Sequence, residues 1–209
     1  MGRHLIVNAD DFGYSHSINR GIIEAHTKGI VTSTSVMVDA IAAEEAKNLV
    51  QYPNLTIGLH LQLDSLDNVE AELHRQVDKF ISIVGRKPDH VDTHKRHTTD
   101  ERIKEVLEEY VKSSKIPIRN FGVKHIGSFG INSNDTSQGQ LKKSINEATE
   151  HFNELMTHCG YSDDYLREHS SYSDPREQEL ESICEPAIKK YIAEKELQLC
   201  NWRQISTDS

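Results

Sequence analysis

Hydrophobic and polar positions along the chain follow two spacings that take turns. Short apolar runs rich in β-branched residues alternate with longer segments in which apolar residues recur every three or four positions, as is typical of buried strands and amphipathic helices. The short runs predict strands at residues 4–7, 31–40, 55–63, 89–94, 118–123, 154–160 and 197–202. The longer segments predict helices at residues 15–29, 41–52, 68–84, 98–114, 141–152 and 174–195. The Gly/Ser/Asn-rich residues 124–140 are interpreted as a long loop with a short strand near 125–129.

Two of the predicted helices have clear start signals. Thr98 stands three residues before Glu101, which is the pattern of a capping box. Asp174 precedes Pro175, and proline is favoured in the first helical position because it has no amide hydrogen to leave unpaired. For the same reason Pro186 is expected to kink or split the last helix.

The alternation of strands with helices indicates an α/β fold with parallel strands. An open doubly wound sheet and a barrel both fit this order, but the unusual polar residues favour the barrel. They fall at the carboxyl ends of predicted strands that lie far apart in the sequence: Asp10, Asp11, His60, His94 and His158. In a barrel these ends surround one mouth, whereas an open sheet gathers only those near its switch point. We therefore expect a single domain over residues 1–209 with about seven parallel strands.

The polar residues at the strand ends predict a metal site. One aspartate and two histidines from separate strands are a common ligand set for a catalytic divalent ion, because they leave positions for water and substrate. Successive side chains alternate in a regular strand, so Asp10 and Asp11 are expected to play unequal roles, one as a ligand and the other as a base. His60 shares a face with Gly58 in an alternating segment and is interpreted as an interior ligand.

The identity of the second histidine ligand is left open by the sequence. His90, Asp92 and His94 share one face of the predicted strand, so any of them could bind the metal, and Asp92 could instead support a ligand by a hydrogen bond. His97 follows two basic residues and is interpreted as solvent-facing. The remaining histidines share no spacing and are interpreted mostly as surface residues: His4, His16, His26, His74, His125, His151 and His169.

Composition narrows the classes of function. The 209 residues are 36% hydrophobic and 27% charged, with a formal net charge of −9 at pH 7. An acidic chain without a long run of lysine or arginine is not expected to bind nucleic acid. No stretch approaches the roughly 20 apolar residues of a membrane span, and the N-terminal residues do not resemble a signal peptide. We therefore expect a cytoplasmic protein with no membrane partner, whose three widely spaced cysteines are reduced.

Several motifs resemble, in order, those of the YdjC-like carbohydrate deacetylase family. They extend over about residues 4–202 and read NADDFGYS, GLHLQL, PDHVDTH, ELMTHCGYSDD and SYSDPREQEL. The resemblance implies a distorted (β/α) barrel like that of the polysaccharide deacetylases, holding one divalent metal ion, Mg or Zn. It also implies a hydrolase that removes N-acetyl groups from a small carbohydrate such as a chitooligosaccharide.

The resemblance also implies roles for individual residues. It makes Asp11, His60 and His94 the metal ligands, Asp10 the general base and His158 the general acid. Arg176 is similar to a late arginine of the family and would lie near the site. Tyr14 at the mouth could stack against a sugar ring, and Asp92 could hold a ligand in place. Members of the family tend to form dimers, so a homodimer is a further expectation.

The sequence departs from the family pattern at three places and leaves other functions open. Arg96 and Thr98 stand where further histidines are common, Cys159 replaces a proline, and the connection after residues 55–63 is short. Lys95 and Arg96 could bind a phosphate, so a metal-dependent phosphoesterase is one alternative. A noncatalytic sugar-binding protein on the same fold is another.

Overall fold

A curved parallel sheet forms the centre of the molecule. The computed structural model describes residues 2–95, 100–130 and 135–205. Within them the sheet has seven strands: β1 (Arg3–Phe12), β2 (Ser33–Val36), β3 (Thr56–Leu61), β4 (Val91–Thr93), β5 (Lys124–Ser128), β6 (Phe152–Thr157) and β7 (Leu197–Leu199). All the strand pairs are parallel, in the order β4-β3-β2-β1-β6-β5, and β7 pairs with the start of β1. The predicted barrel-like α/β fold is confirmed.

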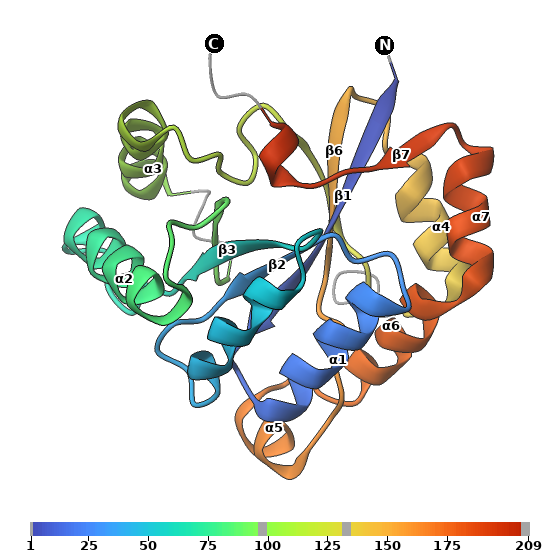
Figure 1. The fold of residues 1–209 in the computed structure, drawn as a ribbon, viewed down its shortest axis with the longest axis horizontal. Helices are drawn as coiled ribbons and strands as arrows, with labels where there is room; N and C mark the ends of the chain where they lie inside the picture. The colour runs from blue at the N-terminus through green and yellow to red at the C-terminus, as the bar shows by residue number, and fades with distance from the viewer. Residues whose placement is uncertain (1, 96–99, 131–134, 206–209) are drawn as a thin grey trace.

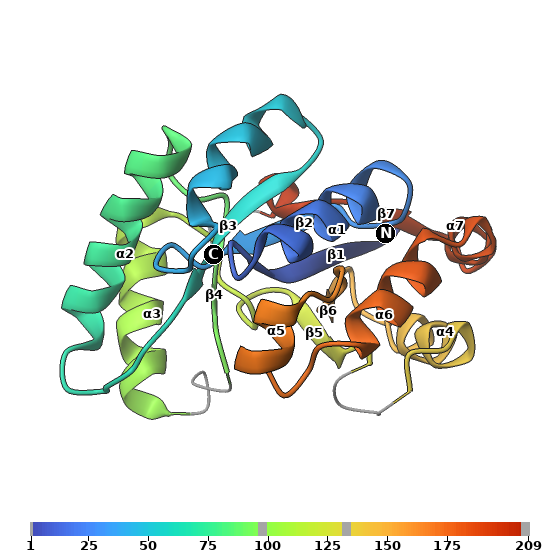
Figure 2. The same ribbon diagram turned by 90° about the horizontal axis from the view of Figure 1, so that it is seen from below.

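Helices surround the sheet (Figures 1 and 2). Their bounds are α1 (His16–Thr27), η1 (Ala43–Gln51), α2 (Val69–Val84), α3 (Glu101–Ser114), α4 (Gln138–Asn146), α5 (Asp164–His169), α6 (Pro175–Cys184), α7 (Pro186–Glu194) and η3 (Trp202–Gln204). Figure 2 shows α2 and α3 at the β3–β4 end of the sheet and α4, α6 and α7 at the other. In the described part of the chain, no helix is both long enough and apolar enough to cross a membrane.

Burial on both faces of the sheet explains the apolar character of the strands. Every residue of β2 and β3 is buried, as is β1 from Leu5 to Phe12. Parallel strands covered by helices on their outer face have this near-continuous apolar sequence. Buried polar residues interrupt it, namely Asn8, Asp10 and Asp11 in β1, Ser33, Thr34 and Ser35 in β2, and Thr56 and His60 in β3. Polar groups in such positions need partners, so these residues point to a site inside the sheet.

The segment between α3 and β5 is not a strand, so the prediction of a strand at residues 118–123 is wrong. Ile118 makes a single bridge to Val91, and Asn120 and Gly122 then adopt left-handed backbone conformations with φ of 73° and 72°. A strand cannot continue through such residues. The pairing to β6 begins only at residue 124, where the sequence predicted a short strand inside a loop.

This segment spans the gap between the two ends of the sheet. The amide of Val91 donates to the carbonyl of Pro117 at 3.0 Å, and the amide of Arg119 donates to the carbonyl of Val91 at 3.1 Å. Among the described residues, β4 and β5 do not pair with each other. The connection therefore takes the place of a closing strand and carries the Arg119 side chain to the interior, where it is 5% exposed.

Smaller differences concern the ends and types of elements. The strand predicted at 31–40 is only the four residues of β2, and the helix predicted at 41–52 is the 3₁₀ helix η1. Thr98 lies outside the described residues, and Asp100 caps α3 by accepting from the amide of Arg102. The Asp174 side chain does not cap α6 but accepts hydrogen bonds from Ser162 and Arg167. The predicted split of the last helix at Pro186 is confirmed.

Close backbone contact between α1 and the segment after β6 positions the carboxyl end of that strand. A Cβ atom at Gly21 would lie 2.5 Å from the Cα of Gly160 and 2.9 Å from the amide nitrogen of Tyr161. The amide of Gly160 also donates to the carbonyl of Arg176, at 3.2 Å. Only a residue without a side chain lets the helix approach so closely.

We expect Gly21→Ala to lower the free energy of unfolding by about 1–3 kcal/mol, because the added methyl group overpacks a backbone contact. Gly139→Ala in α4 is the matched control, since its nearest neighbour, Ser137 Oγ, lies 3.5 Å from the new Cβ. That variant should be as stable as the parent or slightly more stable. Urea unfolding of the three proteins provides the measurement, and equal midpoints for Gly21→Ala and its parent would contradict the proposed contact.

Candidate metal centre

The polar residues at the strand ends line one cavity of about 720 Å³. The residues predicted from the sequence that line it are Asp10, Asp11, Tyr14, His60, His94, His158 and Arg176. Residues that the sequence did not single out also line it, among them Arg119, Asn120, His125, Met156 and Tyr172. The prediction that distant strand ends converge on one mouth is confirmed, because Asp10, Asp11, His60, His94 and His158 all line this cavity.

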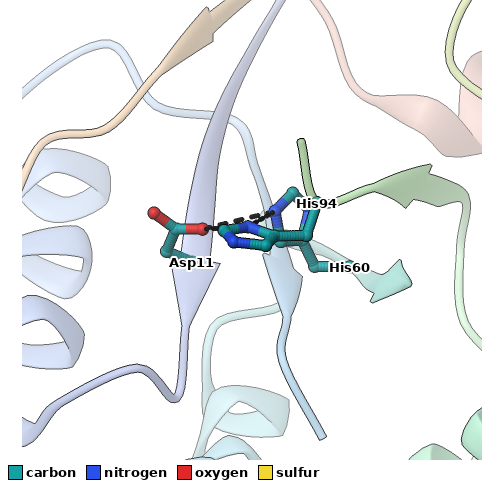
Figure 3. Close-up of side chains that lie close together, drawn as sticks. All are labelled: Asp11, His60 and His94. Carbon is teal, nitrogen blue, oxygen red and sulfur yellow. Dashed lines mark hydrogen bonds and ion pairs between the residues drawn. The ribbon is translucent and has the colours of Figure 1, made fainter. Parts of the chain in front are cut away.

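Three of these side chains point at a common centre (Figure 3). Asp11 Oδ1 lies 3.3 Å from His60 Nε2 and 3.4 Å from His94 Nδ1, and the two nitrogens are 3.2 Å apart. Ligand atoms bound about 2.0–2.1 Å from a zinc ion in a tetrahedral site lie about 3.3–3.4 Å from each other. Asp11 Oδ1 is buried and has no hydrogen-bond partner among the described residues. The three atoms therefore have the spacing of a metal ligand set, and the carboxylate oxygen among them lacks the partner that a metal ion would provide.

An irregularity at the end of β1 brings Asp11 into this group beside Asp10. The pairing of β1 with β2 shifts register between Ala9 and Phe12, and Asp11 has a φ of 70°. Aspartate tolerates this left-handed conformation better than most residues. The alternation expected of a regular strand is thus interrupted, and both carboxylates line the same cavity.

Arg176 holds the second oxygen of Asp11. Its Nη2 donates to Asp11 Oδ2 at 2.7 Å and its Nε donates to the carbonyl of Tyr172 at 2.8 Å. Burial alone would raise the pKa of Asp11, but the charge of Arg176 and the nearby imidazoles of His60 and His94 hold it well below the usual range. Asp11 is therefore ionised, with one oxygen engaged and the other directed at the histidines. Arg176 thus lies in the cavity wall in contact with Asp11.

Asp92 lies behind His60 and orients its ring. His60 Nδ1 is 2.6 Å from Asp92 Oδ1, so the proton on Nδ1 faces the carboxylate and Nε2 faces Asp11 and His94. Burial alone would lower the pKa of His60, but the charges of Asp92 and Asp10 raise it to about 10. His90, an alternative ligand, instead stacks on Trp202 with ring centroids 4.6 Å apart. His94 is thus the residue of its strand that joins the group.

Arg119 links the carboxylates that surround His60. Its Nη1 and Nη2 donate to the two oxygens of Asp10 at 2.8 and 2.7 Å, and its Nε donates to Glu154 Oε1 at 2.8 Å. Arg119 Nη2 also lies 2.9 Å from Asp92 Oδ2. Asn8 Nδ2 completes the contacts of Asp10 at 2.8 Å. A second group of possible ligand atoms, from Asp10, His60 and Asp92, already has this guanidinium between its carboxylates.

The buried charges of the site favour a divalent cation. Four carboxylates that are at most 1% exposed, those of Asp10, Asp11, Asp92 and Glu154, face the guanidinium groups of Arg119 and Arg176 and no other in the described part of the chain. With His60 neutral, as a metal ligand must be, this cluster has a formal charge of −2. Without a metal, the raised pKa of His60 keeps a proton on the ring, which reduces the charge to −1. Uncompensated charge is costly away from water. The donor set and the charge therefore both fit one divalent metal ion at Asp11, His60 and His94.

His158 lies in another wall of the cavity. Burial lowers the pKa of His158 to about 4, although the charge of Asp11 acts in the opposite direction, so the ring is neutral near pH 7. Its backbone amide donates to Glu179 Oε2 at 2.8 Å, and Thr157 Oγ1 donates to the same oxygen at 2.6 Å. Burial raises the pKa of Glu179 to about 7. Sequence reasoning missed Glu179, which anchors the end of β6.

Tyr14 and the connection between α5 and α6 form the rim of the cavity. The Tyr14 hydroxyl donates to the carbonyl of His169 at 2.8 Å, and Ser170, Ser171 and Tyr172 line the cavity beside it. Lys95 lines the rim near His94. Arg96 and His97, which the sequence analysis also considered, lie outside the described residues.

Several functional residues escaped sequence reasoning for identifiable reasons. Asn8 and Glu154 interrupt apolar strand segments, and a polar residue in such a segment is a signal that could have been used. Arg119 carries no comparable signal, because residues 118–123 read IRNFGV, and a charge beside an asparagine does not stand out as a polar residue in an apolar run does. His125 was grouped with surface histidines, yet it is 21% exposed and its Nδ1 lies 2.8 Å from Glu154 Oε2.

Solved structures share the fold. A crystal structure from Enterococcus faecalis V583, described as that of a candidate cellobiose-phosphate cleavage protein, has a TM-score of 0.85 at 22% identity, covering 99% of this chain and 100% of that chain. A family 4 carbohydrate esterase from Streptomyces lividans, in complex with acetate, has a TM-score of 0.61 at 13% identity, covering 95% of this chain and 91% of that chain. At these identities the comparisons show the fold alone.

Sequence comparisons identify the family. The chain is 32% identical to a carbohydrate deacetylase of Clostridium beijerinckii, over 96% of this chain and 99% of that protein. It is 31% identical to a chitooligosaccharide deacetylase of Proteus mirabilis, over 98% of this chain and 100% of that protein. The profile of the YdjC-like proteins matches residues 4–68 and 64–194. The chain therefore belongs to the YdjC-like protein family.

Proposed function

We propose that this protein is a metal-dependent hydrolase that removes N-acetyl groups from a small carbohydrate such as a chitooligosaccharide. The observation that carries the proposal is the group of Asp11, His60 and His94 beside a separately held carboxylate, Asp10, in one cavity. The names of the relatives, carbohydrate deacetylase and chitooligosaccharide deacetylase, support the reaction and the class of substrate.

The ligand set proposed for the metal is Asp11 Oδ1, His60 Nε2 and His94 Nδ1. Two imidazoles and one carboxylate suit zinc, and a carboxylate with added waters is compatible with magnesium. A divalent ion bound there would supply Lewis-acid chemistry by polarising a carbonyl oxygen and lowering the pKa of a water molecule. Arg176 holds Asp11 Oδ2, and Asp92 holds His60 Nδ1. The protein therefore orients both of these coordinating side chains before a metal ion binds.

Asp10 is the proposed general base. Arg119 and Asn8 fix the plane of its carboxylate through hydrogen bonds of 2.7–2.8 Å, and Asp10 lines the cavity next to Asp11. A carboxylate held in this way can accept the proton of a water molecule that attacks the acetyl carbon. A positioned general base typically contributes a factor of about 10²–10⁴ to the rate.

His158 is the proposed general acid, which gives a proton to the nitrogen of the leaving amine. Because the ring is neutral near pH 7, with its pKa lowered by burial to about 4, His158 must take a proton from solvent as negative charge develops on the substrate beside it. Asp10 returns the proton taken from the attacking water to solvent, so no net proton is gained or lost by the two residues. The Glu179 carboxylate fixes the backbone amide of His158. Tyr14 at the rim is proposed to stack against the sugar ring.

Other expectations from the sequence remain predictions. A metal-dependent phosphoesterase and a noncatalytic sugar-binding protein are the alternatives that the experiments below separate from a deacetylase. The cytoplasmic location, the single domain over residues 1–209 and a homodimer also stay predictions.

Purified protein with zinc or magnesium is expected to release acetate from oligomers of N-acetylglucosamine, and a chelator should abolish that release. Asp10→Asn should lower turnover by about 10²–10⁴-fold because it removes the base, while its metal content stays unchanged. His94→Ala should lose the metal itself, and His74→Ala, on the surface, is its matched control. Acetate assays and elemental analysis of the same samples give both quantities.

Three results would contradict this scheme. Release of phosphate from phosphate esters without release of acetate would favour the phosphoesterase. Metal retention in His94→Ala combined with metal loss in Asp10→Asn would reverse the assignment of ligand and base. Binding of the sugar without any turnover would favour the noncatalytic alternative.

Binding of zinc should release about one proton per ion at pH 7, because His60, with its pKa raised to about 10, must lose a proton to become a ligand. The apparent affinity should therefore rise about tenfold per pH unit between about pH 6 and 9 and fall on acidification. Calorimetry in two buffers with different ionisation enthalpies measures the protons released. A zinc affinity that is independent of pH would show that His60 does not lose a proton when the metal binds, and so would contradict its role as a ligand with a raised pKa.

A further inference from the structure

The cavity continues beyond the proposed metal ligands along the edge strand β5. Asn120, His125, Gly127 and Met156 line this part, which we name the β5 arm. The whole cavity of about 720 Å³ falls within the range of about 300–1,000 Å³ of pockets that enclose drug-sized ligands. It has room for more than the single sugar unit that carries the acetyl group.

His125 is held in the β5 arm by a buried carboxylate. It lies opposite Glu154 in the pairing of β5 with β6, and its Nδ1 is 2.8 Å from Glu154 Oε2. Glu154 is fully buried, whereas the His125 side chain is 21% exposed. Since a carboxylate fixes the proton of an imidazole on the nitrogen that it contacts, Nε2 is the atom left to bind a ligand. In the described part of the chain, Nε2 has no hydrogen-bond partner.

The same carboxylate connects His125 to the proposed base without placing them in contact. Glu154 Oε1 accepts from Arg119, and Arg119 in turn holds both oxygens of Asp10. A carboxylate and a guanidinium group therefore lie between His125 and Asp10. In the described part of the chain, no hydrogen bond or ion pair joins His125 to Asp10 or to the proposed metal ligands, so His125 is free to contact another part of the substrate.

We propose that the β5 arm binds the sugar unit next to the one that is deacetylated, and that His125 Nε2 accepts a hydrogen bond from a hydroxyl of that unit. The apolar side chain of Met156 provides a surface for the ring, and the exposed amide of Asn120 a second polar contact. This inference rests on the proposed deacetylase function and adds to it a residue, His125, that recognises the second sugar unit.

The test compares N-acetylglucosamine with its β-1,4-linked disaccharide as substrates of the full chain. His125→Ala should raise KM for the disaccharide about 3- to 10-fold, as expected for one lost hydrogen bond, and leave KM for the monosaccharide and both kcat values unchanged. His125→Gln, whose amide oxygen can accept a hydrogen bond, should recover part of the loss. His74→Ala, in the exposed part of α2, should match the parent protein.

A second measurement keeps the inference separable from the proposed function. Calorimetry with the β-1,4-linked disaccharide of glucosamine needs no turnover, and His125→Ala should weaken this binding by the same factor. If the parent protein releases no acetate, the proposed function fails and the binding comparison alone decides the inference.

Three outcomes would overturn the inference. The first is unchanged kinetics and binding in His125→Ala. The second is an equal loss of kcat on both substrates, which would show that His125 acts only through Glu154 and Arg119 on Asp10. The third is an equal rise of KM on both, which would place His125 beside the acetylated unit itself. Unfolding midpoints of all variants identify any loss that comes from misfolding.

Discussion

Four buried carboxylates that share two guanidinium partners in the described part of the chain are the constraint around which the interior of this protein is arranged. Asp10, Asp92 and Glu154 share Arg119, and Asp11 has Arg176. Breaking a buried ion pair by removing one partner typically costs about 3–5 kcal/mol, so the two arginines are structural necessities as well as parts of the site. The remaining negative charge lies beside Asp11 Oδ1, the one oxygen of these four carboxylates without a hydrogen-bond partner among the described residues. A bound divalent cation resolves this imbalance.

The fold meets this constraint through a few local departures from regularity. The left-handed conformation of Asp11 brings two consecutive carboxylates into one cavity. The connection at residues 117–119 replaces a closing strand and so brings Arg119 between the ends of the sheet. Backbone irregularities of this kind are concentrated at functional sites because the surrounding structure must hold them in place. The regular strands bring the side chains of the site to one end of the sheet, and the irregular positions direct Asp11 and Arg119 into the cavity.

The sequence predicts those parts of the site that depend on local pattern. Asp11, His60 and His94 stand toward the carboxyl ends of predicted strands, and parallel strands in a barrel bring such ends together, so their convergence could be foreseen. The role of Arg119 depends on how far the sheet curves before β4 and β5 face each other, which no local pattern encodes. His125 was misjudged for a related reason, because the spacing of histidines along the chain says nothing about which strand edge meets the cavity. The strand predicted at 118–123 failed where two left-handed residues end the extended backbone.

The measurement that tests the central claim most directly is a crystal structure of the protein grown with manganese or zinc, with anomalous differences recorded at the metal edge. The account predicts one peak bounded by Asp11 Oδ1, His60 Nε2 and His94 Nδ1, at about 2.0–2.3 Å from each atom. A peak between Asp10 and Asp92 with Arg119 displaced, or a bound metal that contacts none of the three predicted ligands, would contradict it.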